Sequence, residues 1–267
     1  MVEISHLTIA TDKGKFLLKD INLNVERNKI KGMTGASGSG KSTLIKIIMG
    51  LPDYNTKIVS GEIVVNSIDI LSLSSHQKRQ MLGLKIGFIP QQPMASFFPY
   101  QIVGKQMVTA LSIRKKISRN LARKKILDML EILNLKDPLR IIKSYPSQLS
   151  GGMLQRLVIA NLLILQPPII LADEPTSALD DENKSILLNY LLKLKNNTSI
   201  LFISHDISAL KKVCDSICIM ERGQIKFDGL MDFFINKKMS NNDIGWIENF
   251  QEELKKTNKE NWKWENL

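Results

Sequence analysis

Cysteine is scarce in this chain, and its scarcity excludes several architectures. Among 267 residues there are two cysteines, Cys214 and Cys218, which are too few for a disulfide framework or a four-thiolate metal site. Both stand among apolar residues in "VCDSICIM", a setting typical of buried structural thiols. The pattern therefore predicts inert, reduced thiols and fits a cytoplasmic setting.

Long apolar runs are also absent. The longest candidate, "LVIANLLILQPPIILA", is interrupted by Asn161, Gln166 and the Pro167-Pro168 pair, so we expect no membrane span. The N-terminal "MVEISHLTIA" lacks the basic, apolar and small-residue progression of a secretory signal. A composition of 43% hydrophobic and 24% charged residues is typical of a soluble globular chain with a substantial core.

Aromatic residues are few, at 6%, and they do not alternate with basic residues as in a base-stacking surface. The formal net charge of +11 predicts an acidic partner, and nucleic acid, anionic lipid and nucleotide phosphate all satisfy that charge. The lysines are scattered, as in "RKKISRNLARKK", which favours a solvated surface over a nucleic-acid groove. We therefore expect no nucleic-acid partner.

Strand and helix patterns alternate along most of the chain. Strand patterns occur at 3–10, 21–26, 61–70, 84–90, 169–174, 199–204, 216–220 and 224–229. Residues 30–50 read as a strand, a glycine-rich loop and a helix, and further helix patterns occupy 182–194 and 207–213. Because several strands are continuous apolar runs, the alternation indicates a mainly parallel sheet covered by helices on both faces.

A helical block interrupts this alternation at about 95–160. Residues 101–135 have a helical pattern, with Ser118 as a plausible N-cap. Its apolar stripe consists of Ala122, Ile126, Met129, Leu130 and Leu133. A second helix follows Ser150 and continues until Pro167 ends it.

The stretch "GASGSGKS" matches G-x-x-x-x-G-K-[ST] and lies between a strand and a helix. Glycines permit a tight loop whose amides converge on phosphate oxygens, and the helix start adds positive potential. Lys41 is expected to reach the β- and γ-phosphates and Ser42 to hold Mg²⁺. The alternative is a chance glycine-rich turn. The predicted phosphate-binding residues are Gly35, Ala36, Ser37, Gly38, Ser39, Gly40, Lys41, Ser42 and Thr43.

Acidic residues end the apolar strand of "IILADEP". Asp173 is expected in the Mg²⁺ shell and Glu174 beside the water that attacks phosphorus. Taken alone, the pair also fits a helix N-cap. "ILFISHD" places His205 at the end of another strand, where it either contacts the γ-phosphate or is a structural hydrogen-bonding residue. Gln91, after "IGFIP", falls at the equivalent edge and could reach the metal or the water.

The stretch "LSGGMLQR" carries no carboxylate, histidine or cysteine. Its paired glycines leave backbone amides bare at a helix start, which predicts an anion there. The residues concerned are Leu149, Ser150, Gly151, Gly152 and Met153.

Six motifs in order, "GASGSGKS", Gln91, "LSGGMLQR", "IILADEP", "SALD" and "ISHD", resemble the nucleotide-binding subunit of an ATP-binding-cassette transporter over about residues 2–235. The segment "LKDPLRIIKSYPSQLSGGMLQRL" is similar to the peptide/nickel uptake branch, and most to importers of nickel and cobalt chelates. The resemblance implies an α/β P-loop NTPase core with an N-terminal antiparallel β subdomain and an inserted α-helical subdomain. It implies an ATPase domain over 1–235 and a partly helical tail over 236–267.

The same resemblance implies the partners. Two ATPase subunits, more often different chains than identical ones, form a head-to-tail sandwich in which 149–153 of one covers the γ-phosphate bound by the other. The seam between them is lined by Ser177, Ala178, Leu179 and Asp180. Two transmembrane permease subunits, and through them an extracytoplasmic solute-binding protein, complete an importer at the cytoplasmic face of the cell membrane. The cargo implied is nickel, cobalt, a metal chelate or a peptide.

The sequence departs from the family pattern in places. The aromatic that stacks on adenine is replaced by Thr11, with Phe16 nearby, and Asn28-Lys29 replaces the customary Gly-Glu. The tail carries no cysteine, so no iron–sulfur centre is predicted. The aromatics Phe97, Phe98 and Tyr100 either receive a short helix of a membrane partner or belong to the core of the helical block.

Two other functions remain to be weighed. A soluble cassette ATPase acting on ribosomes or DNA usually has two joined cassettes or a long coiled coil, and neither pattern is present. A P-loop kinase or GTPase leaves "LSGGM" and "ISHD" unexplained, and the chain lacks an Asn-Lys-x-Asp segment.

Overall fold

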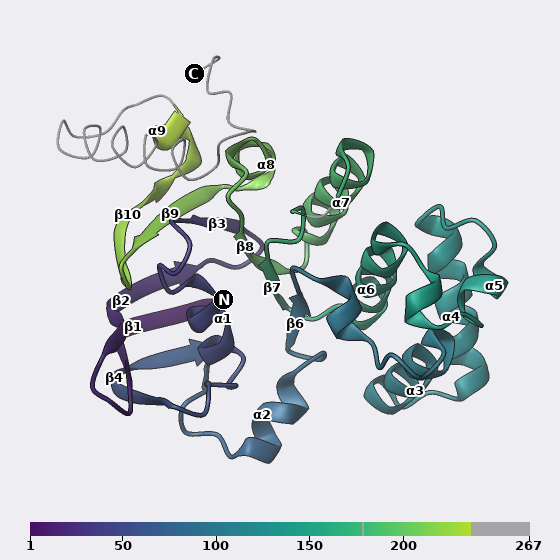
Figure 1. Ribbon diagram of the computed structural model, residues 1–267, viewed down its shortest axis with the longest axis horizontal. Coiled ribbons are helices and arrows are strands. Elements are labelled where there is room, and N and C mark those ends of the chain that lie inside the picture. The colour runs from purple at the N-terminus through teal and green to yellow at the C-terminus, as the bar shows by residue number, and fades with distance from the viewer. Residues whose placement is uncertain (178, 236–267) are drawn as a thin grey trace.

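The computed structural model describes residues 1–177 and 179–235, which form two sheets and a group of helices (Figure 1). The first sheet is built from β1 (Val2–Thr11), β2 (Phe16–Val25), β4 (Thr56–Val65) and β5 (Ile68–Asp69). Its strands are antiparallel and lie in the order β2-β1-β4-β5. The second sheet contains β3 (Ile30–Thr34), β6 (Ile86–Ile89), β7 (Ile169–Asp173), β8 (Ser199–Ile203), β9 (Ser216–Glu221) and β10 (Gln224–Leu230).

The second sheet has the order β10-β9-β3-β8-β7-β6, and every pairing except β9 with β10 is parallel. The α-helices in the described part of the chain are α1 (Lys41–Ile48), α2 (Ser75–Met81), α3 (Val103–Lys115), α4 (Arg119–Ile132), α5 (Pro138–Ile141), α6 (Gly151–Leu165), α7 (Asp181–Leu194), α8 (Ile207–Val213) and α9 (Met231–Ile235). Short 3-10 helices occur at Pro93–Ser96 and Pro146–Gln148. This arrangement confirms the predicted fold class.

The parallel sheet separates two hydrophobic cores. Along β7, Ile169 and Leu171 face the core shared with α1 and the antiparallel sheet, whereas Ile170 and Ala172 face the core shared with α6 to α8. Both faces of the strand are therefore buried, which explains why its sequence is a continuous apolar run rather than an alternating one.

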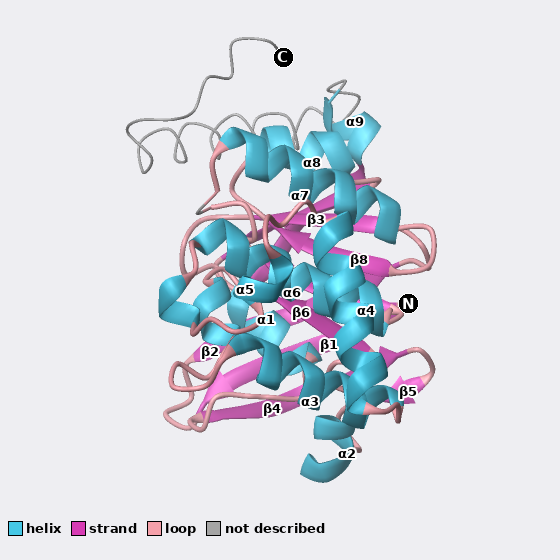
Figure 2. Cartoon of the chain, turned by 90° about the vertical axis from the view of Figure 1, so that its right-hand side faces the viewer, coloured by secondary structure: helices cyan, strands magenta, loops and turns pink. Residues whose placement is uncertain are grey.

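The helices α3 to α6 follow β6 and precede β7 in the chain, and they lie to one side of the sheets (Figures 1 and 2). Contacts of α3 and α4 with α6 connect this group of helices. The predicted Ser118 cap is confirmed, because its hydroxyl accepts a hydrogen bond from the Leu121 amide at 3.2 Å. Of the predicted stripe, Met129 is partly buried and the others are fully buried.

Two predicted elements were wrong in their boundaries. The single strand expected over 61–70 is a hairpin, because Asn66 and Ser67 adopt left-handed φ values of 48° and 65° and reverse the chain between β4 and β5. The helical pattern over 101–135 is two helices, because Lys116 is left-handed, with φ 52°, and ends α3. The tail over 236–267, including Trp246, Trp262 and Trp264, lies outside the described residues.

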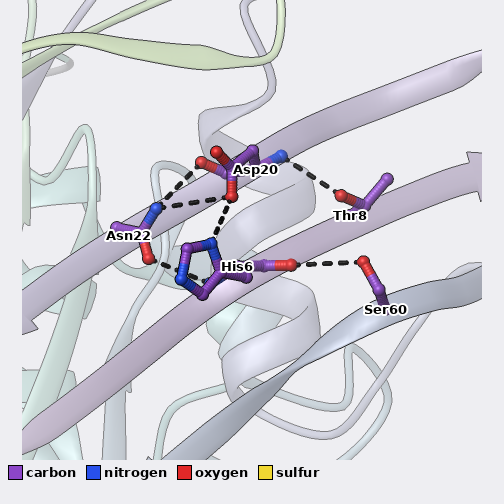
Figure 3. A network of polar contacts seen from close by, with 5 residues as sticks. All are labelled: His6, Thr8, Asp20, Asn22 and Ser60. Carbon is purple, nitrogen blue, oxygen red and sulfur yellow. Dashed lines mark hydrogen bonds and ion pairs between the residues drawn. The ribbon is translucent and has the colours of Figure 1, made fainter.

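A bulge interrupts the pairing of β1 with both of its neighbours (Figure 3). His6 and Asp20 each have a backbone φ of 50°, and the His6 Nδ1 lies 2.8 Å from the Asp20 carboxylate. Asn22 accepts from the His6 amide, and Thr8 accepts from the Asp20 amide at 3.2 Å. These polar contacts satisfy backbone groups that the ladder leaves unpaired.

The two cysteines are buried and free, as predicted. Burial raises the pKa of the Cys218 thiol to about 12 and raises that of Cys214 well above its usual value. Both thiols are therefore protonated and packed, and neither contributes chemistry.

Candidate functional site

The phosphate loop connects β3 to α1, and its shape requires glycine. Gly35, Gly38 and Gly40 all have positive φ. A Cβ on Gly35 would lie 2.1 Å from the Met220 carbonyl oxygen, so only glycine fits against β9. The tip of the loop, Ser37 with Gly38, is exposed.

Lys41 is buried beneath this loop, at 7% exposure. Its Nζ donates to the carbonyl oxygens of Gly35 at 2.7 Å and Ala36 at 2.9 Å, and to the Ser39 hydroxyl at 3.3 Å. Burial lowers the pKa of Lys41, while the carboxylates of Glu174 and Asp173 oppose that shift. The ammonium is thus held between the loop and the acidic residues.

Ser42 and Asp173 make the oxygen cluster expected for a divalent cation. The Ser42 hydroxyl, in the first turn of α1, lies near enough to the Asp173 carboxylate at the end of β7 to lower its pKa. Burial raises the pKa of Asp173, and the Ser42 hydroxyl and the Lys41 charge act against it. A hydroxyl beside a carboxylate fits Mg²⁺, which prefers oxygen ligands. Thr43 follows as a half-buried residue.

Glu174 and His205 lie together at the carboxyl edge of the parallel sheet. Glu174 has a left-handed φ of 48°, and its backbone amide donates to the carbonyl oxygen of Ile203 at the end of β8. The Glu174 Oε1 is 3.2 Å from the His205 Nε2, although the contact lacks hydrogen-bond geometry. The His205 backbone amide donates to the Glu174 Oε2 at 3.4 Å.

The environment shifts the pKa of both groups. Burial raises the pKa of Glu174 to about 7, against the His205 amide and Lys41, which lower it. Burial lowers the pKa of His205 to about 4, and the Lys41 charge adds to the shift. The Glu174 Oε1 and the His205 Nδ1 are both buried without a hydrogen-bond partner. Such orphaned polar atoms point to an absent polar ligand.

Gln91 follows β6, which pairs in parallel with β7. Strand β6 therefore ends at the same sheet edge as β7, where Asp173 lies. The Gln91 side chain is exposed and makes no hydrogen bond within the described part of the chain. The structure brings the strand ends together without joining this side chain to the acidic cluster.

The segment 149–153 forms the start of α6. Ser150 caps the helix by accepting from the Met153 amide at 3.2 Å. Ser150 and Gly151 are exposed, and a Cβ on Gly151 would meet nothing within 4 Å. Among the described residues, no hydrogen bond or ion pair joins this tip to the phosphate loop. The bare helix start is thus open on the surface.

The expected seam residues lie between Glu174 and α7. The Ser177 hydroxyl and amide both donate to the Glu174 carbonyl oxygen, at 2.9 and 3.2 Å. Leu179 is half-buried, and Asp180 is the N-cap of α7. Ala178 lies outside the described residues.

Three polar residues near this segment were not predicted. Arg156, on α6, donates to the side-chain oxygen of Asn183 on α7. Lys184 donates to Asp206, the residue after His205. The available signal was local: Asn183 stands three residues after the helix-capping Asp180, a position that often reaches back to the cap.

The aromatics after Gln91 divide into two groups. Phe97 is buried in the core of the helical region, whereas Phe98 and Tyr100 are 75% and 94% exposed. Gln106 fixes their loop by accepting from the Phe98 amide at 2.8 Å and donating to the Gln101 carbonyl at 2.6 Å. The core interpretation is therefore confirmed for Phe97, whereas the contact of Phe98 and Tyr100 with a membrane partner stays a prediction.

Strand β2 runs beside the phosphate loop. A Cβ on Gly40 would lie 2.7 Å from the Leu18 side chain. Two residues earlier, Phe16 is 49% exposed, with the Lys19 ammonium 5.5 Å from its ring centre. Thr11 is half-buried at the opposite end of the same hairpin turn.

Residues 18–177 match the family model described as ABC transporter. The chain is 39% identical over 228 residues to a metal-staphylopine import system ATP-binding protein of Staphylococcus aureus strain Mu50, covering 84% of each chain. It is 36% identical to a dipeptide transport ATP-binding protein of Bacillus subtilis strain 168, covering 84% of this chain and 68% of that one. The ATP-binding cassette MJ0796, dimeric with ADP and Pi, matches with a TM-score of 0.76 and 30% identity over 86% of this chain and 99% of that one.

No helix in the described ranges 1–177 and 179–235 is both long enough and apolar enough to cross a membrane.

Proposed function

The chain belongs to the ABC transporter family, and from this premise we propose that it is the ATP-hydrolysing subunit of a membrane importer. One observation carries the proposal: the phosphate-loop lysine, the Asp173 carboxylate and the Glu174–His205 pair converge at one edge of the parallel sheet. The relatives named above include an import-system and a dipeptide transport ATP-binding protein, and neither name supports a soluble ATPase acting on ribosomes or DNA. The proposed cassette spans 1–235, with the helical subdomain inserted at about 95–160.

The nucleotide phosphates bind in the loop between β3 and α1. The loop glycines keep its amides accessible, and the start of α1 adds positive potential. Lys41, which now donates to two loop carbonyls, donates to phosphate oxygens when the triphosphate is present. Ser42, Asp173 and Gln91 are the residues that would hold Mg²⁺, which supplies neutralisation of phosphate charge. Phe16 is the exposed aromatic available to the adenine ring.

Glu174 orients and deprotonates the attacking water. Its buried Oε1 has no hydrogen-bond partner, so a water there satisfies an otherwise costly polar atom. A pKa of about 7 places this carboxylate near the optimum for a general base at neutral pH. The neutral His205 lies beside it and is available to the γ-phosphate. Charge neutralisation and positioning then carry the in-line displacement.

A second ATPase subunit completes the site. Ser150 and Gly151 at the start of α6 are exposed, and in the described ranges no hydrogen bond or ion pair joins them to the phosphate loop, so they are free to cover phosphate bound by a second subunit. Ser177, whose hydroxyl donates to the Glu174 carbonyl oxygen, and Asp180, the N-cap of α7, are the seam residues that would face the same partner. The importer branch favours two different ATPase chains, and a pair of identical chains is the alternative.

The membrane partners bind outside the ATP site. Exposed Phe98 and Tyr100, held by Gln106, offer an apolar surface to a helix of a permease subunit. Two permeases and an extracytoplasmic solute-binding protein place this subunit at the cytoplasmic face of the membrane. The cargo is nickel, cobalt, a metal chelate or a peptide.

The test compares Glu174→Gln with the unchanged chain, purified with its partner subunits. Nucleotide binding is expected to remain while turnover falls at least about a hundredfold, the scale of losing a general base. Undiminished turnover would overturn the assignment. Cargo is tested separately, by uptake of radioactive nickel, cobalt chelate and dipeptide in cells with and without the gene.

A further inference from the structure

The proposed mechanism leaves one polar cluster unexplained, where α6 meets the first turn of α7 (Figure 1). Its members are Arg156, Asn183 and Asp180. None of them belongs to the phosphate loop or to the acidic pair at the sheet edge.

Asn183 is the centre of this cluster because its side-chain amide both accepts and donates hydrogen bonds. Its Oδ1 accepts a hydrogen bond from the Arg156 guanidinium. Its Nδ2 donates to both carboxylate oxygens of Asp180, at 2.8 and 3.0 Å. One amide therefore bridges a cation on α6 and an anion in the seam segment, two groups that it can satisfy simultaneously.

The bridge lies directly against the exposed tip of α6. A Cβ on Gly152 would stand 3.4 Å from the Asn183 Nδ2, an ordinary van der Waals distance, so the Asn183 side chain lies next to the tip. Arg156 also reaches the Asn134 carbonyl, beyond the end of α4, at 3.5 Å. Hydrogen bonds of Arg156 thus connect α6 with the end of α4 and with α7, next to the tip.

The next residue extends the connection to the catalytic edge. Lys184 donates to Asp206, which directly follows His205 and caps α8. The first turn of α7 therefore contacts α6 through Asn183 and the residue after His205 through Lys184.

We propose that Asn183 is a positioning residue that fixes the 149–153 tip relative to Asp180 of the seam, so that both meet a second ATPase subunit as one rigid edge. The inference rests on the proposed function, because the tip must act on nucleotide held by that subunit. Asn183 itself touches neither nucleotide nor metal. It acts through Arg156 and Asp180.

The test is Asn183→Ala in the full chain with its partner subunits. The helix cap survives this change, because the backbone amide of residue 183 still donates to the Asp180 Oδ1. Losing hydrogen bonds to two charged groups is expected to lower turnover about tenfold at saturating ATP. Affinity of the isolated chain for a fluorescent ATP analogue is expected to change less than about twofold, because its own phosphate loop is intact.

Asn189→Ala is the matched control, since Asn189 is an exposed asparagine on the same helix. Thermal unfolding of both variants is measured beside turnover. If Asn183→Ala fails to fold, Asn183→Asp replaces it: the carboxylate keeps the acceptor for Arg156 but opposes Asp180, and the same loss of turnover is expected. Coupling to Arg156 is measured by adding Arg156→Gln, and the double variant is expected to be no worse than the poorer single one.

Ser150→Phe separates this proposal from the proposed function. If Ser150→Phe abolishes turnover while Asn183→Ala matches Asn189→Ala, the bridge is wrong and the function stands. If Ser150→Phe leaves turnover unchanged, the tip does not act on nucleotide and both proposals fall. Additive losses from Arg156→Gln and Asn183→Ala would also overturn the bridge.

Discussion

The Nε2 of His205 lies 3.2 Å from the Oε1 of Glu174, and the two side chains are only 30% and 12% exposed. They come from the ends of neighbouring strands, β8 and β7, that pair in parallel. Burial moves their pKa values in opposite directions, to about 4 for the histidine and about 7 for the glutamate. At neutral pH the histidine is therefore neutral, and the glutamate is close to half ionised.

The raised pKa of Glu174 predicts the pH dependence of ATP hydrolysis. Because the base must be ionised, kcat/KM is expected to rise through an apparent pKa near 7 and to level off above about pH 8. The measurement is steady-state hydrolysis between pH 5.5 and 9 at constant ionic strength. Glu174→Asp is the control that should move the midpoint. A flat profile across this range would contradict the assignment of Glu174 as base.

The raised pKa of Glu174 also predicts a stability effect. A carboxyl whose folded pKa exceeds its unfolded value binds more protons in the folded state, so the free energy of unfolding falls as pH rises from about 4.5 to 7. Glu174→Gln removes that ionisation. The variant is expected to be about 2 kcal/mol more stable than the unchanged chain at pH 8, with little difference at pH 4.5. Urea unfolding at both pH values measures this, and an equal difference at both would refute it.

The meeting of these residues at one sheet edge was predictable because they lie at the ends of apolar strands. Asp173 is the last residue of β7, Gln91 and His205 each stand two residues beyond a strand, and parallel pairing brings the strand ends together. The Asn183–Arg156 bridge was not predictable in the same way, because 27 residues separate its ends and no spacing rule links them. The reversal at Asn66-Ser67 was missed because the apolar pattern continues across it.

Two glycines predict opposite effects of the same substitution. Gly35→Ala places a Cβ 2.1 Å from the Met220 carbonyl oxygen at a positive φ, so we expect a loss of at least about 2 kcal/mol of stability together with nucleotide binding. Gly151→Ala meets open space at the first position of α6, so stability should be unchanged or higher by up to about 1 kcal/mol.

The two glycine variants are distinguished by comparing thermal unfolding with turnover in the presence of the partner subunits. Gly151→Ala is expected to lower turnover because, in the proposed pairing, its methyl group would add bulk to the tip that covers the neighbouring subunit's nucleotide. A Gly151→Ala chain that is stable and fully active would show that the tip tolerates bulk, contrary to the closing arrangement proposed.

Lys41→Met is expected to abolish ATP binding while leaving the fold intact. Methionine preserves the aliphatic stem under the loop but removes the ammonium that donates to Gly35, Ala36 and Ser39. Equilibrium binding of a fluorescent ATP analogue, with circular dichroism as the folding check, measures both effects. Lys46→Met, an exposed residue of the same helix, is the control. Tight nucleotide binding by the Lys41→Met chain would mean that the triphosphate binds elsewhere.

Replacing the exposed aromatics predicts a separation of transport from hydrolysis. Phe98→Ser with Tyr100→Ser should leave ATP hydrolysis by the chain and its second ATPase subunit, without permease, within about twofold, because both side chains are exposed outside the ATP site. Cargo uptake by cells carrying the double variant should fall at least about tenfold, because the permease loses its apolar contact. Tyr54→Ser, at a residue that is 99% exposed elsewhere on the surface, is the matched control. Uptake equal to that of the Tyr54→Ser strain would exclude these aromatics from the permease interface, whereas loss of hydrolysis by the paired ATPase subunits without permease would place them in the ATPase fold instead.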